Sequence, residues 1–290
     1  MKAELLERVG MLLLRKGFTV KCLPRSSFDI VARKDGRILI IKVLQDANSI
    51  SSELAREMTR IASFLSAAPV VVAEKAGSDL EDGVVYSRFG VYAVSFSTLE
   101  DCVEDRLPFV MSNQSGLTVS VSSERLARNM EEKGYSLSGL SRRVGVSRQM
   151  LVRYRTGKSE ISVRKASVMQ RIFGDSIFEK VNIFSSRADE NQENPSVIAK
   201  KYENLGFRAA DTRKAPFDII ARKESEIILT GVGDKLNPEF VALTRLIDAD
   251  KLMIFERKKP KEKHVPSMSK NDFMGMETAR ELIRFVREFE

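Results

Sequence analysis

The chain has 290 residues, with 48 Lys and Arg against 40 Asp and Glu, and a formal net charge of +8. A composition of 43% hydrophobic and 30% charged residues is typical of a globular protein and excludes a disordered chain, and this length suggests roughly two domains. No apolar run approaches the roughly 18 to 20 residues that a membrane helix needs, and the charged N-terminus does not resemble a secretory signal, so we expect a cytoplasmic protein without a membrane segment.

The first third of the chain alternates helical and strand-like patterns. A helix is predicted over 3–16, and Gly17 ends it. The turn Lys34-Asp35-Gly36 joins two of the strands that follow. The strands and shorter elements are predicted over 19–23, 27–32, 37–44, 69–73, 84–86 and 91–95, with a second helix over 53–65 and a helical turn over 98–103. This order predicts an α/β sandwich domain over residues 1–112.

Asp29 lies in the stretch SSFDIVARKDGRILIIKVL, which resembles the PD-(D/E)xK nuclease fold, in particular archaeal Holliday-junction resolvases. In that fold an Asp on one strand and a later Glu-x-Lys hold a divalent metal and position the attacking water. Here the Glu-x-Lys register falls on Lys42-Val43-Leu44, so the second carboxylate and the lysine are missing. Because Mg²⁺ prefers oxygen ligands, we expect the chemistry to be lost unless Glu7, Asp46 or Glu53 supplies a ligand.

The stretch from Ser136 to Arg171 carries the charge imbalance of the whole chain. It holds nine basic residues and one acid, Glu160, whereas the rest of the chain has 39 basic and 39 acidic residues. A positive field concentrated in so short a segment is typical of a nucleic-acid contact. An ordinary helical domain with a solvated basic face is the simpler alternative.

Within this stretch the spacing of apolar residues predicts two short helices separated by a tight turn. Gly145 lies at the break, where a positive φ can end the first helix, and Ser147 can cap the second. The positions expected to face inward on the second helix are Ser147, Met150, Leu151 and Tyr154. The positions expected to face outward are Arg148, Gln149, Val152, Arg153 and Thr156. Arg and Gln in such places suit the edges of bases in a major groove.

From about Ser122 to Phe173 the chain resembles the helix-turn-helix of the Cro/C1-repressor type, with a first helix (ERLARNMEEKG), the pair described above, an Arg-x-Gly-Lys step and a further helix after Ser162. The resemblance implies a DNA-binding domain over 117–180 with recognition helix 147–155. Base contacts are expected from Arg148, Gln149, Val152 and Arg153. Phosphate contacts are expected from Ser138, Ser147, Arg142, Arg143, Arg155 and Lys158, although Ser138 stands where many relatives carry a Gln.

The last third of the chain repeats the first. Gly17-Phe18 recurs as Gly206-Phe207, and FDIVARK at 28–34 recurs as FDIIARK at 217–223, both at an offset of 189. A second, degenerate nuclease-like domain is therefore predicted over 195–290. Its Glu-x-Lys register, counted from Asp218, falls on Gly231-Val232-Gly233. The domain boundaries are expected near 111–116 and 185–195. For Asp29 and Asp218 the simpler expectation is a carboxylate that bonds backbone or a nearby arginine.

Cysteine and histidine are too scarce for the common catalytic and zinc arrangements. Cys22 and Cys102 lie far apart without a C-x-x-C pattern, and His264 is the single histidine, in a lysine-rich loop. We therefore expect inert thiols and no disulfide, zinc site, catalytic residue or cofactor.

As a whole, the chain resembles archaeal HTH-type transcriptional regulators. This resemblance implies a regulator that binds double-stranded DNA. We expect a homodimer on a palindromic operator, because one small reading helix makes few base contacts. The flanking domains are left to dimerise or to bind an unidentified effector or protein partner. The alternatives are a structure-specific, resolvase-like DNA nuclease with residual metal-dependent activity, and a protein whose basic face binds RNA or an acidic partner.

Overall fold

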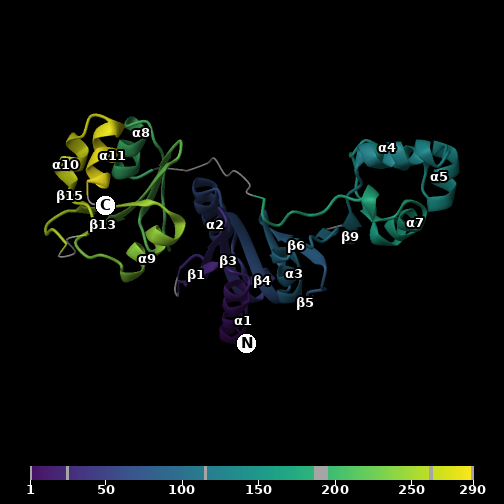
Figure 1. The fold of residues 1–290 in the computed structure, drawn as a ribbon, viewed down its shortest axis with the longest axis horizontal. Helices are drawn as coiled ribbons and strands as arrows, with labels where there is room; N and C mark the ends of the chain where they lie inside the picture. Colours follow the sequence, from purple (N-terminus) through teal and green to yellow (C-terminus); the bar gives the residue numbers. More distant parts are fainter. Residues whose placement is uncertain (1, 24–25, 114–115, 186–194, 261–263, 289–290) are drawn as a thin grey trace.

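The computed structural model describes residues 2–23, 26–113, 116–185, 195–260 and 264–288 (Figure 1). Two α/β domains lie side by side, and a helical domain stands apart from them. None of the helices within these ranges is long and apolar enough to cross a membrane.

The N-terminal domain has the helices and strands expected from its apolar spacing. The hairpin turn between two of the strands has Asp35 and Gly36 at φ 47° and 79°, which suits a tight two-residue connection. The elements are α1 Lys2–Arg15, β1 Thr19–Cys22, β2 Ile30–Lys34, β3 Arg37–Asp46, the 3-10 helix η1 Ala47–Ser49, α2 Ser52–Leu65, β4 Ala68–Ala76, β5 Ser78–Asp79, β6 Val84–Arg88, β7 Val91–Val94 and α3 Phe96–Val103.

One strand begins later than predicted. The sequence indicated a strand over 27–32, but β2 starts at Ile30. The reason is a contact with the other α/β domain, because the Ser27 hydroxyl donates to the Lys214 carbonyl at 2.9 Å and its N–H donates to the same oxygen. These bonds hold the residues before β2 in a bend.

The sheet of the N-terminal domain is covered on both faces. Its first strands follow the order β1-β2-β3-β4-β7, antiparallel up to β3 and parallel from β3 to β7. Residues 68–73 of β4 are all buried, as expected for a central parallel strand. Helices α1 and α3 cover one face, and α2 covers the other.

The predicted boundary at 111–116 falls in a β-hairpin that continues this sheet. Its strands are β8 Val110–Asn113 and β9 Gly116–Val119, and β9 also pairs with β10 Ile161–Ser162 of the helical domain. The chain returns beside it, since the Val181 N–H donates to the Pro108 carbonyl and Ile183 is buried in the core of the N-terminal domain. The boundary near 185–195 lies mostly outside the described residues.

The helical domain contains the helices that the sequence predicted. They are α4 Ser123–Glu132, α5 Leu137–Val144, α6 Arg148–Arg155, α7 Val163–Phe173 and the 3-10 helix η2 Asp175–Ile177. Leu126, Leu140, Leu151 and Met169 are fully buried and join these helices in one small apolar core.

The C-terminal α/β domain repeats the order of the first. Its elements are α8 Val197–Asn204, β11 Arg208–Asp211, β12 Ile219–Lys223, β13 Glu226–Val232, α9 Pro238–Ile247, β14 Asp250–Phe255, β15 Ser267–Ser269, α10 Lys270–Gly275 and α11 Ala279–Arg287. The strand order β11-β12-β13-β14-β15 has the same directions as β1-β2-β3-β4-β7. Helices α8, α10 and α11 cover the outer face, and α9 covers the inner one.

The two α/β domains share one apolar core, built from the inner faces of both sheets with α2 and α9. The contacts are related by the repeat. Arg33 donates to the carbonyl of Leu246 at the end of α9 (3.3 Å), and Arg222, 189 residues later, donates to the carbonyl of Phe64 at the end of α2 (2.7 Å). The repeats thus pair about an approximate twofold axis within a single chain.

Candidate functional site

Helix α6 is fixed by a cap at its start and by apolar anchors along one side. The Ser147 hydroxyl accepts the Met150 N–H at 3.1 Å, and Gly145 ends α5 in the left-handed region at φ 71°. Leu151 and Tyr154 are buried, and burial raises the pKa of the Tyr154 hydroxyl. The tight turn between α5 and α6 therefore has the predicted conformation.

The opposite side of α6 is open to solvent. The four residues expected to read bases, Arg148, Gln149, Val152 and Arg153, are all exposed, and Val152 is 38% exposed. The prediction for the inner side was correct for Leu151 and Tyr154 but wrong for Ser147, which is exposed because its hydroxyl caps the helix instead of entering the core. Met150 is half-buried. This face can reach a groove without rearrangement of the domain.

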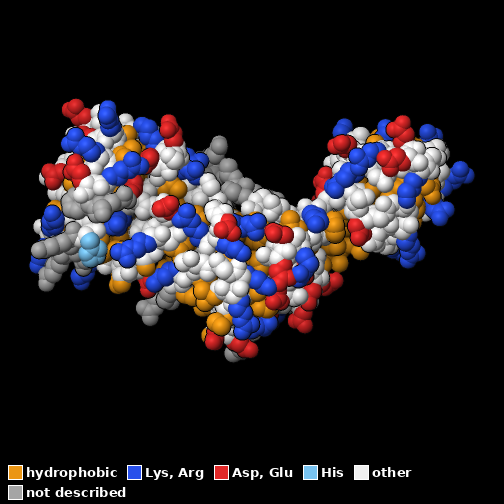
Figure 2. Space-filling view, in the orientation of Figure 1, with side chains coloured by type: hydrophobic (Ala, Val, Ile, Leu, Met, Phe, Trp, Pro, Cys, Tyr) orange, Lys and Arg blue, Asp and Glu red, His pale blue; other side chains and the backbone are white. Residues whose placement is uncertain are grey.

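Basic side chains surround the exposed face of α6. Arg142, Arg143, Arg155 and Lys158 are exposed, whereas Ser138 is half-buried. Figure 2 shows Lys and Arg side chains at the outer end of the helical domain, where α5 lies. Lys165 has a structural task, since its ammonium donates to the Gly145 carbonyl at 2.8 Å. The base and phosphate contacts themselves stay predictions.

Glu160, the single acid of the basic stretch, faces away from this surface. Its carboxylate accepts bonds from the Thr118 hydroxyl and, at 2.8 Å, from the Asn113 amide. Both partners belong to the β8–β9 hairpin. Glu160 therefore helps to fix the helical domain to the β8–β9 hairpin and does not interrupt the basic face.

Asp29 lies immediately before β2, and both of its carboxylate oxygens have partners. One oxygen accepts the Val43 N–H at 2.8 Å, and the other lies 3.3 Å from the ammonium groups of Lys42 and Lys2. The expected backbone bond is confirmed, but the charged partners are lysines instead of an arginine. Burial lowers the pKa of Lys42, and the attraction of Asp29 opposes that shift.

These residues do not fit a divalent metal. The Lys42 ammonium occupies the space beside Asp29 where a metal cation would sit, and no group of three or more His, Cys, Asp or Glu that could hold a metal occurs among the described residues. The substitutes that the sequence suggested are engaged or point elsewhere. Asp46 accepts backbone bonds, Glu53 pairs with Arg213, and Glu7 lies on the outer side of α1.

The second repeat keeps the aspartate and its bond to the backbone but has no lysine at the place of Lys42. Asp218 accepts the Val232 N–H at 2.7 Å, which repeats the bond of Asp29 to Val43. The place of Lys42 is taken by Gly231, where a Cβ would lie 2.4 Å from the Met253 sulfur. No side chain fits there unless Met253 moves. Desolvation raises the pKa of Asp218 above its usual 3.8.

Neither of the thiols nor the histidine belongs to a metal-binding group among the described residues. Cys102 is buried, which raises its pKa to about 12, and Cys22 is exposed. His264 is exposed in the loop after β14. A thiol with so high a pKa is not a nucleophile at neutral pH.

The sequence identified Asp29 and the positions at which the Glu-x-Lys would be expected, but not that the Lys42 ammonium lies beside the Asp29 carboxylate. The signal was present, because a lysine stood in the place of the metal-binding Glu. The role of Glu57 had no such signal. Its buried carboxylate on α2 accepts the N–H groups of Arg213 and Lys214 at 3.0 Å, and so joins the two repeats.

Comparisons with known proteins agree with the geometry. Residues 2–108 match the PD-(D/E)XK superfamily domain, and residues 125–177 match the helix-turn-helix family. A "Putative HTH-type transcriptional regulatory protein" of Methanocaldococcus jannaschii is 31% identical over 97% of this chain and 95% of its own. Proteins of the same description from Archaeoglobus fulgidus and Methanospirillum hungatei are 30% and 34% identical, covering 99% and 79% of this chain and 98% and 78% of their own. No solved structure matches the chain. The chain therefore belongs to this archaeal family of "putative HTH-type transcriptional regulatory" proteins, and it joins a PD-(D/E)XK superfamily domain to a helix-turn-helix.

Proposed function

We propose that this protein is a cytoplasmic transcriptional regulator that binds a palindromic DNA operator as a homodimer. The observation that carries the proposal is the exposed face of α6, where Arg148, Gln149 and Arg153 stand free of the core within a basic surround. Arg and Gln can each make paired hydrogen bonds to a guanine or adenine edge. The names of the relatives support the same class of function.

The homodimer follows from the small size of the reading surface. One helix of this length contacts only a few base pairs, whereas two modules related by a twofold axis read half-sites about 34 Å apart. Binding would depend on salt, because phosphates would be neutralised by Arg142, Arg143, Arg155 and Lys158. The slope of log K against the logarithm of the salt concentration is expected to be about −0.9 for each phosphate contact.

Selection of bound sites from a random duplex library tests the proposal. The expected product is a palindrome with half-sites one helical turn apart. Enrichment of no sequence, or equal binding of single-stranded RNA in competition, would contradict a sequence-specific DNA regulator and favour the RNA-binding alternative.

Matched variants then separate base readers from phosphate contacts. Arg148→Ala or Gln149→Ala is expected to cost on the order of 1–3 kcal/mol on the selected site and to relax preference at one base position. Lys158→Ala is expected to weaken all duplexes about equally and to lower the salt slope by about one. If Arg148→Ala behaves like Lys158→Ala in both measurements, Arg148 is a phosphate contact.

We further propose that both α/β domains are degenerate PD-(D/E)xK copies and that neither cuts DNA. The support is chemical, since Lys42 neutralises Asp29 in the first copy and Gly231 leaves Asp218 without a second ligand in the other. The two domains would instead hold the subunits together or bind an effector or protein partner.

Incubation of the full chain with linear and branched duplexes in Mg²⁺ or Mn²⁺ tests this loss of activity. No cleavage is expected. Cleavage that Asp29→Ala abolishes would establish the structure-specific nuclease, whereas cleavage that survives Asp29→Ala and Asp218→Ala would point to a contaminating enzyme.

A further inference from the structure

The outward face of α1 carries an apolar centre between opposite charges. Met11 and Leu14 are 45% and 53% exposed. Glu7 lies four residues before Met11 and Arg15 four residues after it, and both are exposed. Residues four apart lie on the same side of a helix. This face of α1 therefore has a negative charge at Glu7, an apolar centre at Met11 and a positive charge at Arg15.

The two charges have no visible task within the subunit. In the described part of the chain, neither the Glu7 carboxylate nor the Arg15 guanidinium has an ion-pair partner. Other charges nearby are engaged, since Lys16 pairs with Glu104. Glu7 and Arg15 are therefore available to a partner.

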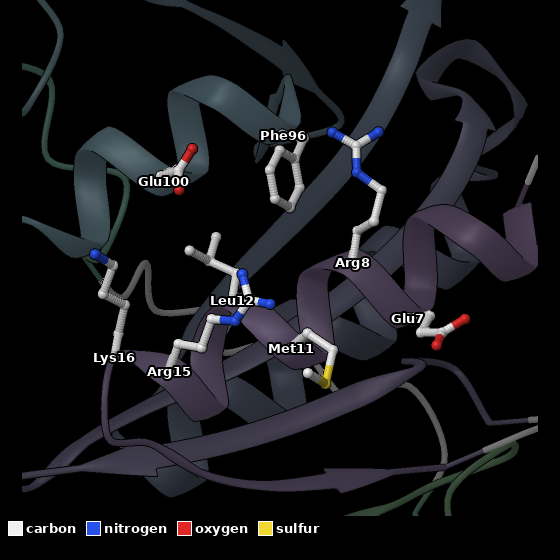
Figure 3. Close-up of a pocket in the computed structure, with 8 residues that line it drawn as sticks. All are labelled: Glu7, Arg8, Met11, Leu12, Arg15, Lys16, Phe96 and Glu100. Carbon is white, nitrogen blue, oxygen red and sulfur yellow. The ribbon is translucent and has the colours of Figure 1, made fainter.

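A groove beside this face offers room for a partner's side chains. It has a volume of about 610 Å³ and lies between α1 and α3 (Figure 3). Leu12 lines it from α1, and Phe96 and Glu100 line it from α3. The Arg8 guanidinium lies 4.3 Å from the centre of the Phe96 ring, which fixes one wall.

We propose that α1 forms the homodimer interface, with a second copy of the chain laying its own α1 antiparallel across this one about a twofold axis at Met11. The proposal rests on the homodimer of the proposed function and names its surface. In an antiparallel pair, Glu7 faces Arg15 of the partner subunit and Arg15 faces Glu7 of the partner subunit, each about 6 Å from the axis at 1.5 Å per residue. One helix face thus complements itself.

Two other helical surfaces of the α/β domains are less suitable for this pairing. The inner faces around α2 and α9 are already covered by the pairing of the two repeats. The equivalent helix of the second repeat, α8, has Ser196, Lys200 and Asn204 at the three positions of Glu7, Met11 and Arg15. It lacks both the apolar centre and the charge pair, so the pattern on α1 is not a general requirement of the repeated fold.

Sedimentation of the full chain over a concentration series, without DNA, tests the interface. The wild-type chain is expected to dimerise. Glu7→Arg and Arg15→Glu, each of which places like charges opposite one another twice, are expected to weaken the dimer about tenfold or more. The double change, Glu7→Arg with Arg15→Glu, restores opposite charges and is expected to recover the dimer. Lys200→Glu, at the equivalent position of α8, should leave dimerisation unchanged.

A wild-type chain that stays monomeric at every concentration overturns the proposal, as does a dimer that tolerates both single changes or is not recovered by the double one. If circular dichroism shows that a charge variant has a lower melting temperature, Met11→Ser provides a second test of the interface. A dimer that Met11→Ser does not weaken also contradicts the proposal. The two proposals can fail separately. If the chain is a monomer that still selects a palindrome, the α1 interface is wrong but the assignment as a DNA-binding regulator stands. If the chain dimerises through α1 but prefers no duplex sequence, the regulator assignment is wrong but the interface stands.

Discussion

Both repeats place an aspartate immediately before the equivalent strand, β2 or β12, but the surroundings of the two carboxylates differ. Asp29 is 6% exposed and lies within 3.3 Å of two ammonium groups. Asp218 is exposed and makes the same backbone bond without a cationic partner at that place, where the chain has Gly231. Both aspartates also make equivalent main-chain bonds, so the carboxylate's bond to a backbone N–H belongs to the part of the arrangement that the two repeats share.

The difference shows that one scaffold can fill the space beside this carboxylate in two ways. In the first repeat the Lys42 ammonium lies 3.3 Å from the buried Asp29 carboxylate. In the second repeat the space closes, because the Met253 side chain lies over Gly231. We therefore expect the stability of the first repeat to depend on the ion pair between Asp29 and Lys42, and that of the second to depend on the absence of a side chain at Gly231.

Removal of the carboxylate charge is expected to produce the largest contrast. Asp29→Asn leaves Lys42 buried without its principal counter-ion and should cost about 3 kcal/mol of unfolding free energy. At the exposed Asp218, Asn keeps an oxygen that can accept the Val232 N–H, so Asp218→Asn should change the unfolding free energy by about 1 kcal/mol or less. Urea titration of the two variants measures both. Equal losses would mean that the ion pair contributes nothing beyond the backbone bond.

Filling the glycine of the second repeat should come next. Gly231→Ala brings a Cβ against the Met253 sulfur and is expected to cost about 2 kcal/mol through overpacking. Gly10→Ala is the matched control, because a Cβ there meets nothing within 4 Å inside helix α1, and it should stabilise the protein by roughly 0.5 kcal/mol. Thermal melts of the two proteins compare them. A neutral Gly231→Ala would show that Met253 moves aside freely.

The contacts between the repeats offer a smaller test of their symmetry. Arg222 donates to the Phe64 carbonyl and the Ser66 hydroxyl, both at 2.7 Å, whereas Arg33 donates to the Leu246 carbonyl at 3.3 Å. Arg222→Ala is therefore expected to cost about 1.5 kcal/mol and Arg33→Ala about 0.5 kcal/mol. The reverse order in chemical denaturation would contradict the geometry.

The smallest effect concerns pH. The pKa of Asp218 is raised above 3.8 in the folded protein, so the folded state holds its proton more tightly than the unfolded chain. The stability from this group is complete below pH 3.8 and is lost as pH rises through the raised pKa. The difference in unfolding free energy between the parent and Asp218→Asn should change in that window. A difference that does not vary with pH there would exclude the shift.

Local features were the most predictable from the sequence. The caps at Ser147 and Gly145, the turn at Asp35-Gly36 and the two copies at an offset of 189 depend on neighbouring residues or on identical strings. The exposed face of α6 followed from helical spacing once its buried residues were assigned. Ser147 was misplaced because a capping hydroxyl and a buried one occupy similar positions in the pattern.

Long-range features were beyond such reasoning. The bend at Ser27 depends on a carbonyl 187 residues away, and Glu57 finds its partners across the repeat interface. Two short helices near the C-terminus, α10 and α11, and the β8–β9 hairpin were not assigned. For α10 and the hairpin the segments are too short to show a clear period, whereas the apolar residues of α11, Ala279, Leu282 and Val286, do recur at helical spacing and could have indicated this helix.

Because the two repeats belong to one polypeptide, their pairing does not depend on the concentration of the protein. Two separate chains that associate through an interface of this kind dissociate when their concentration is low. Here one domain stays tethered to the other, which maintains a high effective concentration even at a few copies per cell. A mutation in one repeat also alters one side of the pair and leaves its counterpart unchanged, so each half is free to acquire its own ligand.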